Sequence, residues 1–258
     1  MNKNKKFKNI SLKNECIIFG NGASIKKFNL RVFYEYDSIV TTMMYLHKDF
    51  NNLRVVADCE IAPFILYKFW KNPYSKKIEN NAKLNLFEKT QRFSKEHPYF
   101  LSLTNYLSKI KKKNFYYLYN FKEKNFSTEI DISKKFTYLS GSIFCMIGLA
   151  KYFGYKKIFL VGVDYLLDPP IIGHFYEKDH YNGLNKVFLD NEIDFFEKIK
   201  SEIEINVIVP KGTKSKLFNS INYEEYFEDK EIEKENYDIV SKNNLKLLDN
   251  LKMEYRIF

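Results

Sequence analysis

Two histidines that lie close together in the chain are the side chains best suited to proton transfer. His174 and His180 fall within seven residues of one another, and Tyr176 and Tyr181 stand beside them. Histidine changes its charge between pH 5 and 8, so it can accept or donate a proton near neutral pH. Acid–base chemistry, anion binding and an inert surface loop are all consistent with this pattern. No metal-ligand spacing accompanies the pair, so we expect no metal site.

A glycine-rich turn follows the first apolar run of the chain. The run 16–19 is followed by the residues Gly-Asn-Gly-Ala-Ser. Glycine lets backbone N–H groups approach an anion closely, and the start of a following helix attracts negative charge. A turn with only a structural role is the alternative. We expect nucleotide or phosphate binding by Gly20, Asn21, Gly22 and Ser24.

Further polar groups are expected at the same edge of the sheet. Ser140, Gly141 and Ser142 precede an apolar helical stretch, where serine can cap the helix or bind a ligand. Asp164 follows the apolar run 157–162, and its carboxylate could bind a ribose, a metal ion or a loop backbone. Ligands of open α/β sheets bind outside the carboxyl ends of the strands, where such turns gather.

Short apolar runs alternate with stretches of helical period along the chain, which predicts an α/β fold with a mostly parallel sheet. Strands are predicted at 15–20, 38–42, 53–57, 115–119, 157–162 and 205–209. Helices are predicted at 25–36, 60–70, 95–113, 143–153 and 188–203, with Gly154 as the C-terminal cap of the fourth.

The same pattern divides the chain into three parts. Residues 1–14 form a basic N-terminal extension, 15–222 a Rossmann-like nucleotide-sugar-binding domain flanked by helices, and 223–258 a charged helical tail. The segment 165–186 is longer than an ordinary connection between elements, and loops of that length are commonly lids or binding loops.

The composition favours an anionic partner, because the net charge is +10. Three isolated cysteines offer no disulfide framework, and neither a signal-peptide core nor a run of about 20 apolar residues occurs. We therefore expect a cytoplasmic protein, peripheral to the inner membrane through its basic surface. The basic runs 1–13 and 109–113 match no nucleic-acid-binding module, so no nucleic-acid partner is expected.

Several of these stretches resemble one family of enzymes. The run FGNGASI at 19–25 resembles the GNGPSL turn of bacterial family 42 sialyltransferases, and 140–164 resembles their SG-helix-GYKEIYLSGID segment. Three later stretches resemble their lid, the helix after it and their last strand, namely 179–183, 193–198 and 205–210. The hydroxymethylpterin diphosphokinase-like domain of flagellin-glycosylation proteins is similar in the same features, and 126–130 is especially like that group.

The resemblance implies a Rossmann-like fold and an inverting, metal-independent transfer of a nonulosonic acid from a CMP-activated donor. It implies no cofactor, because the CMP-sugar is the donor substrate. The acceptor would be a bacterial surface glycan such as lipopolysaccharide or capsule. An anionic membrane surface is a further expected partner, and a homo-oligomer stays open.

The resemblance also assigns roles to residues. Asn21, Ser24, Ser140 and Gly141 match positions that hold CMP, while Thr42 and Asp58 stand where the family has asparagines. The family's catalytic histidine aligns near Leu184, just after His180 and Tyr181, so we expect His180 as the base and keep His174 as the alternative. Hydrogen bonds to the leaving phosphate are expected from Tyr165, Tyr176 or Tyr181.

Two other functions stay open. A pyrophosphoryl transferase that uses ATP and magnesium would need paired carboxylates, for which only Asp58 and Asp164 stand at strand ends. A non-catalytic nucleotide- or glycan-binding module would need neither histidine.

Overall fold

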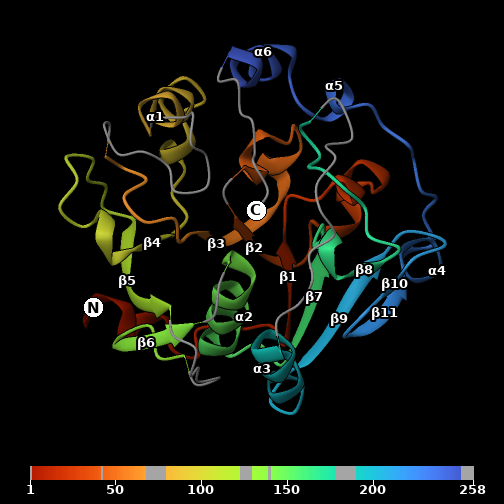
Figure 1. Ribbon diagram of the computed structural model, residues 1–258, viewed down its shortest axis with the longest axis horizontal. Helices are drawn as coiled ribbons and strands as arrows, with labels where there is room; N and C mark the ends of the chain where they lie inside the picture. Colours follow the sequence, from red (N-terminus) through yellow and green to blue (C-terminus); the bar gives the residue numbers. More distant parts are fainter. Residues whose placement is uncertain are drawn as a thin grey trace.

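A nine-stranded sheet forms the centre of the computed structural model (Figure 1). The structure describes residues 2–41, 43–67, 80–122, 130–138, 141–177 and 190–250. The strand order is β11-β9-β7-β1-β2-β3-β4-β5-β6, and the neighbouring strands pair in parallel. The strands are β1 Glu15–Phe19, β2 Asp37–Thr41, β3 Arg54–Glu60, β4 Tyr99–Ser102, β5 Phe115–Lys122, β6 Lys135–Tyr138, β7 Lys157–Val161, β9 Glu204–Val209 and β11 Asn219–Asn222. A separate antiparallel pair joins β8 Leu167–Asp168 to β10 Lys214–Ser215.

Six α-helices and several short 3-10 helices connect the strands of the described chain. The α-helices are α1 Asn80–Lys89, α2 Ser142–Phe153, α3 Asp190–Lys200, α4 Tyr223–Phe227, α5 Asn236–Ile239 and α6 Lys242–Asn250. The 3-10 helices are η1 Asn2–Phe7, η2 Ala23–Lys27, η3 Leu30–Phe33, η4 Met44–Leu46, η5 Phe50–Asn52, η6 Arg92–Ser94, η7 Leu103–Asn105 and η8 Asp164–Leu166.

The central strand order β3-β2-β1-β7-β9 is that of a doubly wound Rossmann-like sheet. After β1 the chain adds strands on one side, and it later returns to add β7 on the other side of β1. The crevice outside the carboxyl ends of β1 and β7 is therefore the topological switch point, where ligands of such sheets bind. This fold class confirms the prediction made from the alternating pattern.

Both faces of the sheet are buried, which explains why its central strands are continuous apolar runs. Side chains alternate across a strand, so Cys16 and Ile18 face the core under α2 and α3, while Ile17 and Phe19 face the other core. In the first core Phe144 of α2 stacks on Phe196 of α3 with ring centroids 4.9 Å apart. Both helices lie in the lower half of Figure 1.

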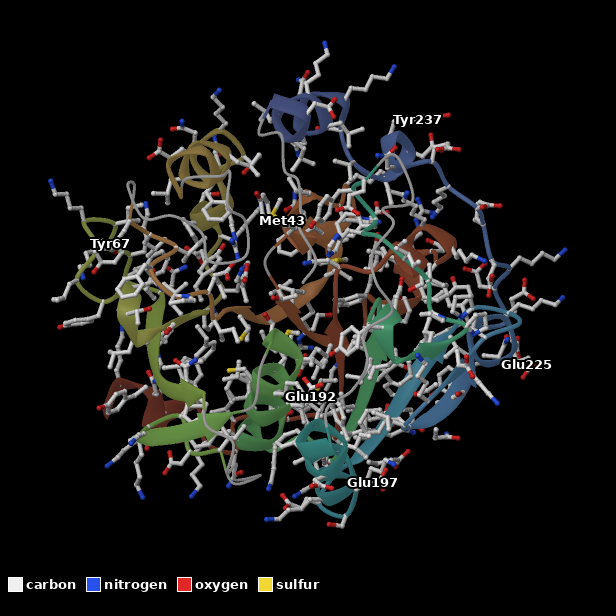
Figure 2. All side chains as sticks on the ribbon, viewed as in Figure 1. Met43, Tyr67, Glu192, Glu197, Glu225 and Tyr237 are labelled. Atoms are coloured by element: carbon white, nitrogen blue, oxygen red, sulfur yellow. The ribbon has the colours of Figure 1, made fainter. Side chains whose placement is uncertain are left out.

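The second core includes the C-terminal region. Tyr223, Ile239, Leu245 and Leu248 are buried there, although α5 and α6 lie at the rim of the molecule, at the top of Figure 1. Met43, labelled in Figure 2 just beyond the end of β2, belongs to the same core and is 1% exposed. The tail thus contributes apolar side chains to the core as well as a charged surface.

Each of the six predicted strands is confirmed as a strand of the sheet. The helix that ends at Gly154 is confirmed too, and the φ of 99° at Gly154 suits glycine. Three helix predictions were wrong. The stretch 25–36 holds η2 and η3, because Phe28 is extended and the Asn29 side chain accepts from the Arg31 N–H at the start of η3. The stretch 60–70 begins as the end of β3 and continues in turns through its described part.

The third wrong prediction covers 95–113, which contains β4 and η7. The reason is the consecutive apolar run Tyr99–Leu101, which is buried between β3 and β5 and satisfies its backbone by pairing with both. Burial and strand pairing of this apolar run therefore decide the local structure, in spite of the helical spacing of the polar residues around it.

Candidate functional site

Two glycine turns touch at the switch point. The Gly20 N–H donates to the Val161 carbonyl and the Gly22 N–H to the Gly162 carbonyl, each at 2.8 Å. A Cβ on Gly20 would come within 2.2 Å of the Gly162 oxygen. Gly162 itself has a φ of +68°, which disfavours other residues. Glycine at these positions therefore lets the ends of β1 and β7 approach each other.

Asp164 anchors the first turn. Its Oδ2 accepts from the Ser24 backbone N–H at 2.7 Å and its Oδ1 from the Ser24 hydroxyl at 2.5 Å. The carboxylate lies so close to Gly22 that a Cβ there would meet it at 2.4 Å. Burial raises the pKa of Asp164 to about 6, while the hydrogen bonds from Ser24 and the nearby His174 oppose the rise. Of the three partners considered for Asp164, the structure shows the loop backbone.

The backbone of the turn is largely used within the protein. Besides the Gly20 and Gly22 N–H groups, Ala23 donates to Gly173, Ser24 to Asp164 and Ile25 to Gly22. The segment after the turn is the five-residue η2 rather than an α-helix. The expected row of N–H groups approaching an anion is therefore not present in this turn.

Asn21 offers the turn's ligand-binding potential through its side chain. Its Oδ1 is buried and has no hydrogen-bond partner in the described structure. A buried acceptor without a donor costs about 1–3 kcal/mol, which a ligand that supplies the donor would recover. The Asn21 backbone carbonyl accepts from the Phe175 N–H at 3.1 Å, so the residue is fixed in place.

A strap, defined as residues 173–177, crosses the glycine turn. Ala23 N–H donates to the Gly173 carbonyl at 3.1 Å, and His174 pairs with Gly22 in an antiparallel bridge. The strap thereby brings His174 to the glycine turn although about 150 residues separate them in sequence. The bridge therefore joins a predicted catalytic residue to a predicted nucleotide-binding residue.

His174 is oriented by a carboxylate that the sequence reasoning missed. Glu177 Oε1 lies 3.0 Å from His174 Nδ1, and Glu177 Oε2 accepts from the His174 backbone N–H at 2.8 Å. A carboxylate only accepts, so Nδ1 is the donor of this pair, which in a neutral ring leaves the lone pair on Nε2. The His174 ring also stacks on Tyr176, with centroids 5.1 Å apart and planes at 8°. The spacing of three residues from His174 to Glu177 was the signal that could have revealed this pair.

Residues of the C-terminal region and of two N-terminal segments contact the strap. Asn236 is 3% exposed, and its side-chain amide donates to the Tyr176 carbonyl at 3.2 Å. Lys26 donates to the Glu177 carbonyl at 2.9 Å. His47, buried beside Phe175 with ring centroids 5.8 Å apart, pairs with Val240 in a β-bridge. No local sequence signal marks Asn236, because its partner lies 60 residues away.

Asp58 lies in a different environment from Asp164. Arg92 is fully buried and donates to Asp58 at 3.1 Å and to Glu60 at 3.4 Å. One cation thus serves two carboxylates. Burial and the Glu60 charge raise the pKa of Asp58 to about 6 against the effect of Arg92. Asp58 is therefore held in an internal ion pair.

The remaining predicted residues are placed as follows. Gly141 is the N-cap of α2 with a φ of 87° and has no side chain with which to cap the helix, and Ser142 is the first residue of the helix. Tyr165 packs against the first core, where burial raises its pKa well above the usual range and keeps it protonated. The lid predicted at 165–186 is described only to Glu177, and Leu166, Leu167 and Phe175 within it are buried. Four predicted residues lie outside the described residues, namely Thr42, Ser140, His180 and Tyr181.

The described residues hold neither a cluster of metal ligands nor a helix suited to span a membrane. Residues 2–41, 43–67, 80–122, 130–138, 141–177 and 190–250 contain no cluster of three or more His, Cys, Asp or Glu side chains that could hold a metal ion. Within the same ranges, no helix combines the length and the apolar character needed to cross a bilayer.

The fold and site define an α/β protein of the Rossmann-like class with a histidine–carboxylate pair at its switch point. No protein-family model matches the chain, and no curated protein matches its sequence. Solved structures with a similar fold include sialyltransferases, the kind of enzyme that the sequence motifs resemble.

Three such structures are sialyltransferases of the Cst type. CstII from Campylobacter jejuni, in complex with the substrate analogue cytidine-5'-monophosphate, has a TM-score of 0.46 and 13% identity, and the match covers 93% of this chain and 98% of that one. The monofunctional alpha-2,3-sialyltransferase Cst-I from the same organism has a TM-score of 0.43 and 16% identity, over 94% and 97% of the two chains. A variant of the alpha-2,3/8-sialyltransferase CstII gives 0.43 and 14%, over 91% and 99%. These are likenesses of fold at low identity.

Proposed function

We propose that this chain is a glycosyltransferase that moves a sialic-acid-like sugar from a CMP-activated donor to a glycan acceptor. The observation that carries the proposal is the His174–Glu177 pair held against the turn of Asn21. The pair lies where β1 and β7 meet, and nucleotides bind at this point in doubly wound sheets. The resemblance of 19–25 and 140–164 to bacterial sialyltransferases selects CMP among the nucleotides and implies inversion without a metal ion.

The nucleotide would be held from two sides. Asn21 supplies a buried acceptor that needs a donor, such as an amino or hydroxyl group of the cytidine. α2 is a twelve-residue helix whose N-cap is a glycine, so its first-turn backbone N–H groups have no partner within the helix, and they and the positive end of the helix dipole would face the phosphate. Gly141 and Ser142 are the described residues at that end, and Ser140 precedes them.

In this proposal His174, paired with Glu177, is the general base. The acceptor hydroxyl attacks the anomeric carbon of the donor sugar while its proton passes to Nε2 of His174. The bond from that carbon to the phosphate oxygen breaks, and CMP leaves with the electron pair. Glu177 stabilises the resulting imidazolium and keeps the ring in the required tautomer. Tyr165 and Tyr176 are the described tyrosines considered as donors to the leaving phosphate.

The pyrophosphoryl-transferase alternative is disfavoured by the carboxylates themselves. Asp164 is engaged by Ser24 and Asp58 by Arg92, so neither offers a ready ligand for magnesium. A non-catalytic binding module would retain Asn21 but would not depend on His174 or Glu177.

Nucleotide binding is tested by calorimetry with CMP, and with ATP plus magnesium as the competing ligand. We expect Asn21→Ala to weaken CMP binding about tenfold or more, whereas Asn243→Ala on the exposed face of α6 leaves it unchanged. Unchanged affinity in Asn21→Ala, or tighter binding of ATP than of CMP, overturns the CMP site.

The base is tested by transfer from CMP-sialic acid to a set of sugar acceptors. His174→Ala should lower kcat by about 10²–10⁴-fold and leave CMP affinity nearly intact, and Glu177→Gln should lower kcat with the histidine still present. If His180→Ala alone loses activity, the base is His180. If all three variants keep full activity, this mechanism is wrong for the protein.

A further inference from the structure

The loop between β4 and β5 carries a concentrated positive charge. Four of the five residues 109–113 are lysines, and the stretch 103–115 contains no acidic residue. Lys109, Lys111, Lys112 and Lys113 are all exposed. The loop lies at the left edge of the view in Figure 1, on the same side as the N-terminus.

The N-terminal helix η1 adds further lysines beside the end of this loop. Asn4 is buried and donates to the Tyr117 and Ile132 carbonyls at 2.9 Å, which docks η1 on β5. This docking places Lys3 where its amine donates to the Lys113 carbonyl at 2.7 Å. Residues 1–13 also contain no acidic residue, so the two basic stretches form one surface.

Apolar side chains are exposed within the same surface. Leu107 is 80% exposed and Tyr106 54% exposed, directly before the lysines. The Lys111 amine lies 4.6 Å from the centre of the Tyr106 ring, and that ring packs edge-on against Tyr117 at 5.2 Å. Burial raises the pKa of Tyr117, and the nearby Tyr106 and Tyr67 add to the rise. Tyr67 is labelled on this side of the molecule in Figure 2.

An apolar cleft opens next to the lysines. It has a volume of about 340 Å³. Its apolar walls come from Leu84, Phe87, Phe93 and Ile110, and Glu88 and Lys112 also line it. Ile110 lies between two lysines of the loop, so the loop presents charge outward and an apolar side chain to the cleft.

We propose that this surface, made of residues 106–113, the cleft and η1, binds the face of an anionic phospholipid bilayer. Lysines attract the headgroup phosphates, while Leu107 and Tyr106 enter the boundary between headgroups and acyl chains. The charge complementarity selects an anionic partner, and the exposed leucine and the apolar cleft select lipid over a soluble polyanion. Tyrosine suits this boundary because one end of its ring is apolar and the other is polar.

The test is co-sedimentation of the full chain with vesicles of phosphatidylcholine alone or mixed with phosphatidylglycerol, without nucleotide. The absence of nucleotide makes the outcome independent of the proposed CMP site. We expect binding only to the mixed vesicles, weakened by high salt because salt screens the lysines. Replacement of Lys111, Lys112 and Lys113 by Gln should lower binding about a hundredfold, roughly fivefold for each lysine. The control replaces three exposed lysines of the C-terminal region by Gln, namely Lys230, Lys242 and Lys246. It removes the same charge and should change binding less than about fivefold.

The apolar contribution has its own variant. Leu107→Ser should lower binding several-fold, while Ile232→Ser, at a side chain 45% exposed in the C-terminal region, should not. Melting curves check that each variant is folded. Binding to single-stranded DNA is measured as well, because DNA is a soluble polyanion without lipid. Equal losses in both lysine triple variants, an unaffected Leu107→Ser variant, DNA binding in place of vesicle binding, or no binding to mixed vesicles would each overturn the proposal.

Discussion

Ser24 gives both its backbone N–H and its hydroxyl to the carboxylate of Asp164, across a separation of 140 residues. This fork joins the turn after β1 to the residue that follows the turn after β7. Both partners are buried, so neither oxygen of the carboxylate can turn to water without breaking a bond. The shape of the candidate site therefore depends on this pair.

Loss of the Ser24 hydroxyl should destabilise the fold. Ser24→Ala leaves Asp164 with the backbone hydrogen bond alone, and a buried partner left unsatisfied costs about 1–3 kcal/mol. Urea unfolding at pH 7 measures the difference. The matched control is Ser201→Ala, which removes an exposed hydroxyl bond to the Lys198 carbonyl and should cost less than about 0.5 kcal/mol. Equal effects of the two substitutions would contradict a special role for the buried pair.

Asp164 should make stability depend on pH in a defined window. Its folded pKa of about 6 lies above the ordinary value of 3.8, so the folded state holds a proton that the unfolded state releases. Stability from this group is complete below pH 4, falls as the pH rises, and is lost above pH 6, a change of about 3 kcal/mol.

The substitution Asp164→Asn removes that titration. The native chain should lose stability between pH 4 and 6, and the variant should not lose this part. The difference in unfolding free energy between the two proteins should therefore shift in favour of the variant across this range, whatever that difference is at pH 4. Unfolding free energies measured at intervals across this range provide the comparison. Parallel curves for the two proteins would show that Asp164 does not titrate in the window.

Arg92 should be among the most costly side chains to remove. Arg92→Met leaves Asp58 and Glu60 buried together without a cation, and breaking a buried pair in this way costs about 3–5 kcal/mol. The loss should be smaller at pH 5 than at pH 7, because protonation of a carboxylate relieves the repulsion. Arg31→Met, at an exposed arginine of η3, should change stability by less than about 0.5 kcal/mol at either pH. A cost for Arg92→Met that does not vary with pH would argue against charged carboxylates at this site.

Asn236 should control how firmly the strap holds to the glycine turn. Asn236→Ala removes the hydrogen bond to the Tyr176 carbonyl, so the strap should open more often. The Phe175 amide, which donates to Asn21 within the strap–turn contact, should then exchange with deuterium faster, by about tenfold for each 1.4 kcal/mol lost. Asn243→Ala is the control, and unchanged exchange at Phe175 in Asn236→Ala would remove the clamping role.

Local sequence patterns were enough for the elements that local chemistry decides. The apolar runs at β1, β7 and β9 are strands because a parallel strand is buried on both faces and needs no polar alternation. Gly154 ends α2 because its left-handed backbone conformation strains other residues. The turn at Gly20–Ser24 was recognisable because the two glycines of Gly-Asn-Gly, directly after the strand, allow a neighbouring backbone to approach closely. From these elements an α/β fold with a mostly parallel sheet could be predicted, and ligand binding outside the strand ends stays a prediction.

The partners of the site residues depend on tertiary structure. Asp164 meets Ser24, His174 meets Gly22 and Asn236 meets Tyr176 only because the strand order places β7 beside β1 and folds the tail over the strap. The same strand order places Asp58 beside Arg92. Asp58, which from the sequence looks available for a ligand, is therefore held in an ion pair. Spacing in the sequence cannot encode contacts between residues 34 to 152 positions apart, since these depend on how crossovers arrange the strands. The sequence by itself thus determined the fold class and the turns, and the tertiary structure decided which side chains face one another.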